Sequence, residues 1–421
     1  MKAELHPESR GFVLWANAAC CTSALRVLLA TVCTPDDRKP VAVARALAAQ
    51  GHVAAVAADR FLGQAGWSRF VSRRIRCPHP RDGLDAYISA LRCAAAEFQA
   101  DALLPLNDYA TLAVSERRTE IEDLVRLAVP PHNALLISRN KFETVRLAQR
   151  IGVPVPPTWL ADSSEALARI SDQIRYPCVA KLVRGAGAIG MVVARSRREL
   201  LEVEISDGPP ADGIFDGSAY VVQEWLQGEL HDVCALFCRG EPRAALVQKR
   251  LQMYPPRGGV GVWNKTVKRP DLVERAFRLL RALAWHGPAQ VEFLVDSHDK
   301  SHLIEINGRF WGTLDLAIAA GVNFPSLACE MALEGDIEPM FDYRTGVGFR
   351  WPLPLGLLAA LTSERPLSSL GRLLAPNASG GKRTQSDLRL FDPAPHIAEL
   401  VYLGMRALQR RSLVPGSRRP S

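Results

Sequence analysis

Two short stretches near residue 300, Val291–Asp296 and His302–Asn307, constrain the fold of this chain most strongly. Both alternate in polarity, and the polar residues between them predict a β-hairpin. With a four-residue turn at 297–300, Glu292 lies opposite Glu305. The same register sets up two further pairs, Gln290 with Asn307 and Asp296 with Ser301. The other face of the hairpin is wholly apolar, so we expect it to be buried in a large core.

The opposed carboxylates of Glu292 and Glu305 are the chemically unusual part of this hairpin. Two like charges facing each other across a sheet are destabilising unless a cation neutralises them. Oxygen ligands from Glu292, Glu305 and Asn307 suit Mg²⁺ or Mn²⁺, which usually keep some waters and bind substrate phosphates. The pattern by itself leaves a second interpretation equally open, in which the hairpin is half exposed and its acids face solvent.

Upstream of the hairpin, strand-like and helical stretches alternate from Arg26 to about Pro131. This alternation predicts an α/β unit with a parallel sheet and helices on both faces. The expected strands are 26–32, 53–56, 72–75 and 102–106, and the expected helices are 39–50, 83–99 and 109–127. The first strand-to-helix turn, 31–40, contains no glycine, so dinucleotide binding is not predicted for this unit.

A glycine loop follows the apolar stretch 177–182, which contains Lys181. Its glycines match the pattern GxGxxG and are Gly185, Gly187 and Gly190. The residues after them, 191–194, are strand-like, whereas a dinucleotide-binding fold needs a helix there. We therefore interpret the loop as a hairpin tip whose backbone N–H groups approach phosphate oxygens, with Lys181 adding a positive charge. An ordinary mobile hairpin is the alternative.

A further strand, 219–222, leads into a short linker. Such a linker can offer backbone groups to an adenine edge, and Glu229 can accept the ribose hydroxyls. The linker residues are Gln223, Glu224, Trp225 and Leu226. The alternative is a strand end followed by a solvated glutamate.

The composition limits the class of protein. The 421 residues carry 52 Lys and Arg against 44 Asp and Glu, a net charge of +8, which is concentrated partly after residue 405. A solvated basic tail explains this better than a nucleic-acid-binding face.

The nine cysteines are scattered and form no CxxC motif, as expected for a cytoplasmic protein. The apolar segment 12–33 meets the requirements of neither a signal peptide nor a membrane-spanning helix, and residues 26–32 within it fit a buried first strand better, with membrane association as the alternative.

Near the C-terminus, 397–409 has the spacing of an amphipathic helix, with Ile397, Leu400, Val401, Gly404 and Leu408 on one face. We expect that face to pack on the protein's own core. A basic amphipathic helix lying on a membrane is the alternative.

Taken in order, these motifs resemble those of the ATP-grasp superfamily, especially its carbamoyl-phosphate-synthetase-like branch of carboxylate-amine ligases. The matching stretches are Asn140-Lys141, Val179–Lys181 with its glycine loop, Gln223–Glu229, Pro255–Val260, Trp285–Glu292 and Glu305–Gly312. The resemblance implies a Rossmann-like pre-ATP-grasp domain followed by a two-lobed ATP-grasp fold, α/β overall and α+β in the lobes. The resemblance also implies domain boundaries. An N-terminal extension covers 1–23 and the Rossmann-like domain covers 24–135. The small lobe covers 136–217, the large lobe with the metal site covers 218–340, and a C-terminal extension with the basic tail covers 341–421.

The resemblance also implies roles for individual residues. Lys141 and Lys181 match the lysines that hold ATP phosphates, and Gly185, Gly187 and Gly190 match a small lid loop. Gln223, Glu224, Trp225 and Leu226 match the adenine hinge, and Glu229 matches the ribose acid. Glu292, Glu305 and Asn307 match the ligands of one or two Mg²⁺ (or Mn²⁺) ions, and Arg309 matches the arginine that steadies the transferring phosphate. Gly258 and Gly259 match a loop that closes over the acceptor.

The implied activity is that of an ATP-dependent carboxylate-amine ligase, which forms a C–N bond through an acyl phosphate and releases ADP and phosphate. Its partners are then small-molecule carboxylates and amines, without nucleic acid or an integral membrane span, and a homodimer is a candidate assembly. Two other functions are kept. One is an ATP-binding regulatory or scaffold module without turnover, against which the retained Glu292, Glu305, Asn307 and Arg309 argue. The other is an NAD(P)-dependent oxidoreductase, which would need a helix starting at Gly190.

Overall fold

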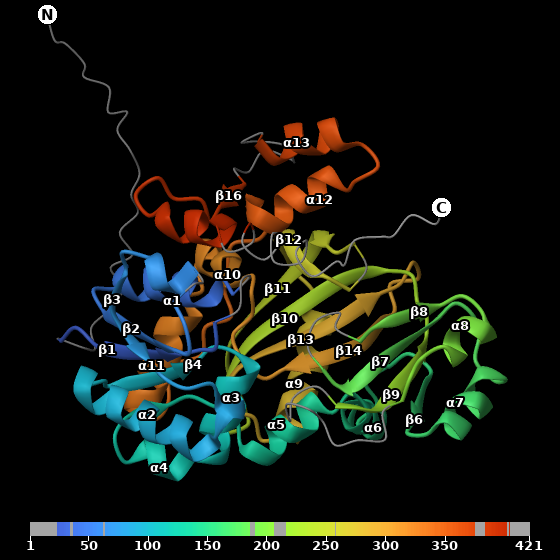
Figure 1. Cartoon of the computed structure of the whole chain (residues 1–421), viewed down its shortest axis with the longest axis horizontal. Helices are drawn as coiled ribbons and strands as arrows, with labels where there is room; N and C mark the ends of the chain where they lie inside the picture. Colours follow the sequence, from blue (N-terminus) through green and yellow to red (C-terminus); the bar gives the residue numbers. More distant parts are fainter. Residues whose placement is uncertain are drawn as a thin grey trace, which may run out of the picture.

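The computed structural model describes residues 23–33, 37–61, 64–185, 190–205, 216–256, 258–374, 384–401 and 404. Its strands form three sheets of five, seven and four strands. Figure 1 shows the five-stranded sheet (blue) and the four-stranded sheet (green) separated by the seven-stranded sheet. The predicted α/β class is confirmed, and two further sheets follow the parallel sheet, as expected for two lobes.

The five-stranded sheet is parallel and has the order β3-β2-β1-β4-β5. Its strands are β1 (Arg26–Ala30), β2 (Val53–Ala58), β3 (Val71–Arg76), β4 (Ala102–Pro105) and β5 (Arg126–Leu127). Alternate residues of β1 enter different cores, because successive strand side chains point to opposite faces. Val27 and Leu29 pack in the core that contains α1 (Lys39–Ala48), whereas Leu28 packs with α2 (Leu84–Phe98).

One predicted helix of this region is wrong. The stretch 109–127 forms α3 (Asp108–Glu116), α4 (Arg118–Glu122) and then β5. Arg117 separates the helices with a non-helical backbone conformation, φ −109° and ψ 34°. The turn lets the chain return to the sheet edge, where β5 pairs with β4.

The four-stranded sheet is antiparallel, in the order β6-β9-β7-β8. Its strands are β6 (Thr158–Ala161), β7 (Cys178–Arg184), β8 (Val192–Ala194) and β9 (Asp216–Glu224), accompanied by α7 (Ser164–Ser171) and α8 (Arg197–Leu201). Gly190 comes just before β8, so the strand expected after the glycines is confirmed. The strand expected at 219–222 is β9. It belongs to this sheet rather than to the large lobe, because it pairs with β6 along one edge and with β7 along the other.

The seven-stranded sheet has the order β14-β13-β10-β11-β12-β15-β16. Its strands are β10 (Glu229–Cys238), β11 (Glu241–Tyr254), β12 (Val260–Val267), β13 (Gly287–Val295), β14 (Ser301–Asn307), β15 (Gly348–Arg350) and β16 (Gln385–Ser386). One face is buried under α5 (His132–Arg139), α6 (Lys141–Arg150) and α9 (Pro270–Ala282). Strands β15 and β16 extend this sheet beyond residue 340, into the stretch that the sequence assigns to a C-terminal extension.

The predicted hairpin is β13 and β14, and its apolar face is buried as expected. Glu292 pairs with Glu305 and Gln290 with Asn307, as predicted. The pairing of Asp296 with Ser301 is wrong, because the register shifts after Glu292 and Val295 faces Ser301. The shift leaves Ile304 as the extra residue of a bulge. Ile304 therefore lines the cleft beside Glu305 instead of joining the buried face.

The remaining helices include α10 (Leu314–Ala320), α11 (Phe324–Glu334), α12 (Leu357–Leu361) and α13 (Pro366–Leu374). In the described part of the chain, no single helix is long and apolar enough to cross a membrane. Only α10 and α11 together pass that test of length and composition, and they meet at an angle of 86°.

The expected packing of the C-terminal amphipathic helix is wrong for the residues described. Helical residues occur over 394–401, yet Ile397, Leu400 and Val401 are exposed. Leu408 lies outside the described residues. The buried side of this segment is polar instead, because it docks through hydrogen bonds, one from Gln64 to Glu399 and one from Arg45 to Asp392.

Candidate functional site

A single cleft brings together six of the residues singled out in the sequence. It holds ≈ 980 Å³ of empty space, the part open to solvent included. Lys141, Lys181, Glu292, Glu305, Asn307 and Arg309 all line it, together with the glycine stretch 258–261. These side chains come from α6, β7, β13 and β14 and from the chain just after β14. The cleft therefore lies between the four-stranded and seven-stranded sheets.

Three acids lie side by side across the strands β10, β13 and β14. Asp232 pairs in register with Glu292, and Glu292 pairs with Glu305. Asp232 is fully buried, Glu292 is 8% exposed and Glu305 is half-buried. The interpretation in which the acids face bulk solvent is therefore excluded by this geometry.

Arg250 provides an internal counter-ion for two of these acids. Its guanidinium lies 2.6 Å from Asp232 Oδ1 and 2.6 Å from Glu292 Oε1. Burial nevertheless raises the pKa of Glu292 to about 7, with Arg250 opposing the rise and Glu305 and Asp232 adding to it. The opposed glutamates thus depend partly on a protein cation, and the acid row still favours additional positive charge.

Asn307 joins the two glutamates. Its Nδ2 donates to Glu292 Oε1 over 3.1 Å and to Glu305 Oε1 over 3.2 Å. Lys141 Nζ lies 3.8 Å from Glu305 Oε2 and donates to the carbonyl of Gly185 over 2.9 Å. The glycine loop, the first lysine and the acid row are therefore connected by direct contacts.

Lys181 lies on β7 and faces the same cleft. It donates to Gln223 Oε1 over 3.3 Å. Burial lowers the pKa of Lys181, which Glu305 opposes and Lys141 reinforces. A partly desolvated lysine without a carboxylate hydrogen bond is suited to an incoming phosphate oxygen.

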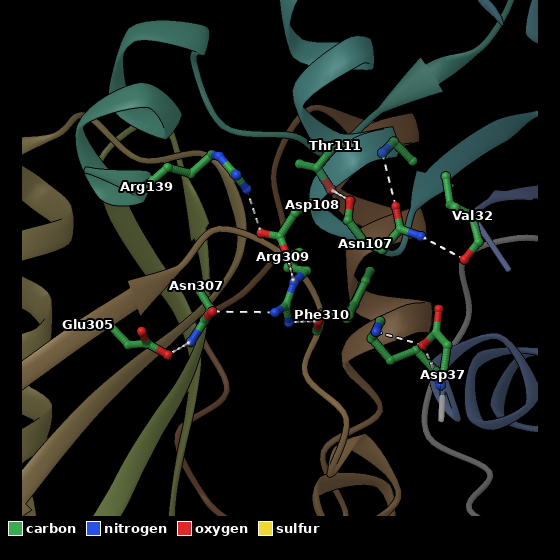
Figure 2. A network of polar contacts seen from close by, with 12 residues as sticks. Val32, Asp37, Asn107, Asp108, Thr111, Arg139, Glu305, Asn307, Arg309 and Phe310 are labelled. Carbon is green, nitrogen blue, oxygen red and sulfur yellow. Dashed lines mark hydrogen bonds and ion pairs between the residues drawn. The ribbon is translucent and has the colours of Figure 1, made fainter. Parts of the chain in front are cut away.

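Arg309 links the cleft to the five-stranded sheet, as Figure 2 shows. Its Nε donates to Asp108 Oδ2 over 2.8 Å, and its Nη2 donates to Asn307 Oδ1 over 3.4 Å. Arg139 Nη1 donates to the other oxygen of Asp108 over 2.9 Å. Although burial opposes ionisation, Arg309 and Arg139 hold the pKa of Asp108 well below its usual range.

Some of the predicted residues do not line the cleft. Glu224 ends β9, Trp225 and Leu226 follow it, and all three are half-buried. The backbone N–H groups of Glu224 and Trp225 donate to the carbonyls of Pro157 and Pro177. Glu229 is exposed at the start of β10 and forms an ion pair with Lys249 over 2.6 Å. Gly187 lies outside the described residues, whereas Gly190 has the positive φ of 67° that favours glycine.

Four cleft or supporting residues were missed in the sequence: Arg38, Asp108, Asp232 and Arg250. Asp232 could have been found by alternation, because it occupies the cleft-face position of β10 opposite Glu292. Arg38 and Asp108 belong to the five-stranded sheet region, and no sequence pattern places them beside residues 200 positions away.

Within the described residues, no group of three or more His, Cys, Asp and Glu side chains is gathered as a metal site. The set at the cleft is smaller, with the two carboxylates of Glu292 and Glu305 beside Asn307, whose Nδ2 faces the glutamates and whose Oδ1 faces Arg309, so the amide must turn to ligate a cation. It fits Mg²⁺, which keeps several waters and uses one or two carboxylates together with substrate phosphates.

Residues 217–351 match a family model described as "ATP-grasp in the biosynthetic pathway with Ter operon". The mitochondrial methylcrotonoyl-CoA carboxylase subunit alpha of Mus musculus is 28% identical over 229 residues, which are 49% of this chain and 32% of that protein. The chain thus spans about a third of the length of the curated relatives it matches.

Solved structures share the fold at low identity. Biotin carboxylase from Campylobacter jejuni, in a complex with β,γ-ATP, has a TM-score of 0.59 at 21% identity and covers 77% of this chain and 74% of its own. L-amino acid ligase from Bacillus licheniformis has a TM-score of 0.56 at 19% identity and covers 76% of this chain and 78% of its own.

Proposed function

We propose that this chain, which belongs to the ATP-grasp superfamily, is an ATP-dependent carboxylate-amine ligase that activates its acid as an acyl phosphate. The product would be an amide or a related C–N bond, with ADP and phosphate released. The names of its relatives support this class, because both carboxylases and an amino acid ligase share the fold.

One observation carries the proposal. A row of acids and a set of basic side chains, Lys141, Lys181 and Arg309, line the same cleft. Phosphoryl transfer needs positive charge around the moving phosphate and oxygen ligands for a divalent ion. A binding module that only retains nucleotide would need no paired carboxylates at that position.

Each of the cleft residues has a separate role in this reaction. Lys141 and Lys181 bind the phosphates, and Arg309 stabilises the phosphate in transfer while Asp108 fixes its orientation. Glu292, Glu305 and Asn307 would hold Mg²⁺. When bound, Mg²⁺ neutralises charge on the phosphate oxygens. Because the amine attacks the acyl phosphate directly, no nucleophilic side chain of the protein is required.

We assign the nucleotide's base to residues 223–226, at the end of β9 and just after it, and its ribose to Glu229. The glycine loop, of which Gly185 and Gly190 are described, is assigned to the phosphates. The ion pair of Glu229 with Lys249 must open for Glu229 to accept the ribose hydroxyls. The seven cysteines within the described residues are free thiols, which supports a reducing, cytoplasmic setting.

The test is a screen for ADP release with Mg²⁺ and ATP over pairs of carboxylates and amines, bicarbonate included, with products identified by mass spectrometry. We expect ADP to form only when both an acid and an amine are present. Glu305→Gln is the negative control. Tight ATP binding without ADP release for any pair, and unchanged by Glu305→Gln, would favour the regulatory or scaffold module instead.

A further inference from the structure

We propose that Arg38 binds a non-reacting carboxylate of a substrate other than ATP. This inference rests on the proposed ligase function and deepens it by naming the chemical class of the substrate. Arg38 directly precedes α1, outside the two lobes, yet it lines the same cleft as Glu292 and Arg309.

Arg38 is a buried cation with no salt bridge to a described carboxylate, and it acts on the buried acids Asp315 and Asp387 only at longer range. It is 5% exposed, and its hydrogen bond within the described part of the chain is a long contact of 3.4 Å from Nη2 to the carbonyl of Gly261. Its guanidinium lies 5.0 Å from the centre of the Trp351 ring. Among the residues that the structure describes, no carboxylate comes within 4.0 Å of it. A buried guanidinium without a direct salt bridge is costly, so its position in a cleft favours an external anion.

The other basic side chains of the cleft are already engaged. Arg250 contacts Asp232 and Glu292, and Arg309 contacts Asp108. Lys141 lies near Glu305, and Lys181 bonds Gln223 and is assigned to the nucleotide. Arg38 shares no contact with these phosphate-side residues. It is therefore the cation available to a different anion.

The surroundings of Arg38 favour a carboxylate. Trp351 lies against the guanidinium and Gly261 engages one nitrogen, which leaves further N–H groups for a planar, bidentate partner. Gly261 belongs to the glycine stretch 258–261, and Arg250 contacts the carbonyl of Gly259 over 3.5 Å. The anion would thus lie where this stretch borders the cleft.

Such a carboxylate has two sources. It is either a second carboxylate on the acid that is phosphorylated or the carboxylate of an amine such as an amino acid. Two matched pairs of probes separate these sources. Succinate and succinamate differ by one carboxylate on the acid, and glycine and glycinamide differ by the carboxylate on the amine.

The experiment is isothermal titration calorimetry of each probe into full-length protein saturated with Mg²⁺ and the non-hydrolysable analogue AMP-PNP. We expect wild type to bind the carboxylate member of at least one pair about 10-fold or more tightly than its amide. Arg38→Gln should bind both members of that pair equally weakly and keep its affinity for AMP-PNP.

Arg38→Lys serves as a second variant in case Arg38→Gln does not fold. It keeps the charge but lacks the planar fork, so we expect about a 3-fold or greater loss of discrimination. A purely structural role between Trp351 and Gly261 would lower the melting temperature of both variants without changing discrimination. The inference is overturned if wild type distinguishes neither pair, or if Arg38→Gln distinguishes a pair as well as wild type does. Failure to bind AMP-PNP would instead refute the proposed function.

Discussion

Asp108 and Arg309 meet at a distance of 2.8 Å, although 201 positions separate them in the chain. Asp108 begins α3, shortly after β4 of the five-stranded sheet. Arg309 follows β14 of the seven-stranded sheet. The contact fixes the guanidinium on the side of Asn307 (Figure 2). A residue of the first sheet region therefore orients a residue at the phosphate end of the cleft.

This contact predicts the effect of Asp108→Asn. The variant leaves Arg309 and Arg139 without their shared counter-ion, so Arg309 should lose its fixed orientation. We expect kcat for ADP formation to fall about 10- to 100-fold, as for a lost charged hydrogen bond, with little change in the Kd of AMP-PNP. Steady-state kinetics and calorimetry measure the two quantities. Asp123→Asn, at an exposed acid, is the matched control and should retain wild-type kcat. An active Asp108→Asn would show that Arg309 needs no such partner.

Gly308 lies between Asn307 and Arg309 at a place with no room for a side chain. A Cβ there would lie 2.4 Å from Leu135 Cδ1 and 2.9 Å from Trp285 Cη2, both in the buried core. Gly308→Ala should therefore lower the free energy of unfolding by about 1–3 kcal/mol and reduce turnover by displacing Arg309. Denaturant unfolding and ADP release test both effects. Gly371→Ala, within α13 and with nothing within 4 Å of the added Cβ, should be at least as stable as wild type.

Lys181 is predicted to bind a nucleotide phosphate. Lys181→Met removes a partly desolvated cation whose side-chain hydrogen-bond partner, among the residues described, is Gln223. We expect the Kd of Mg²⁺-AMP-PNP to rise about 10- to 100-fold, the value of a charge-assisted hydrogen bond. The matched variant Lys300→Met, on the exposed hairpin turn, should bind as wild type does. Equal affinities in the two variants would remove Lys181 from the nucleotide site.

The sequence predicted those parts of the site that depend on local alternation. The register of Glu292 with Glu305 followed from strand periodicity, because a one-residue slip would have exposed Val291 and Ile306. The bulge at Ile304 could not be predicted, since nothing in the local sequence marks an extra residue. Arg38 and Asp108 reach the cleft only through the packing of separate sheets, which no local pattern encodes.

Asp387 predicts how stability depends on pH. Burial raises the pKa of this residue to about 7, and nearby Asp315 adds to the rise. The folded state therefore binds a proton that the unfolded state, with an ordinary aspartate pKa of about 4, releases earlier. The stabilising contribution is complete below pH of about 4 and is lost as pH rises through 7. Between pH 5 and 8, the unfolding free energy of wild type should fall by about 2 kcal/mol more than that of Asp387→Asn. Parallel pH profiles of wild type and Asp387→Asn would contradict the assignment.

The central claim is that Glu292, Glu305 and Asn307 hold a divalent cation beside the phosphates of ATP. Its most direct test is Mn²⁺ binding followed by electron paramagnetic resonance in the presence of AMP-PNP, with wild type compared with Glu305→Gln. We predict saturable Mn²⁺ binding to wild type and at least about a 10-fold weaker affinity in the variant, because a neutral amide replaces one of two ligating carboxylates. Equal Mn²⁺ affinity in the two proteins would contradict the account.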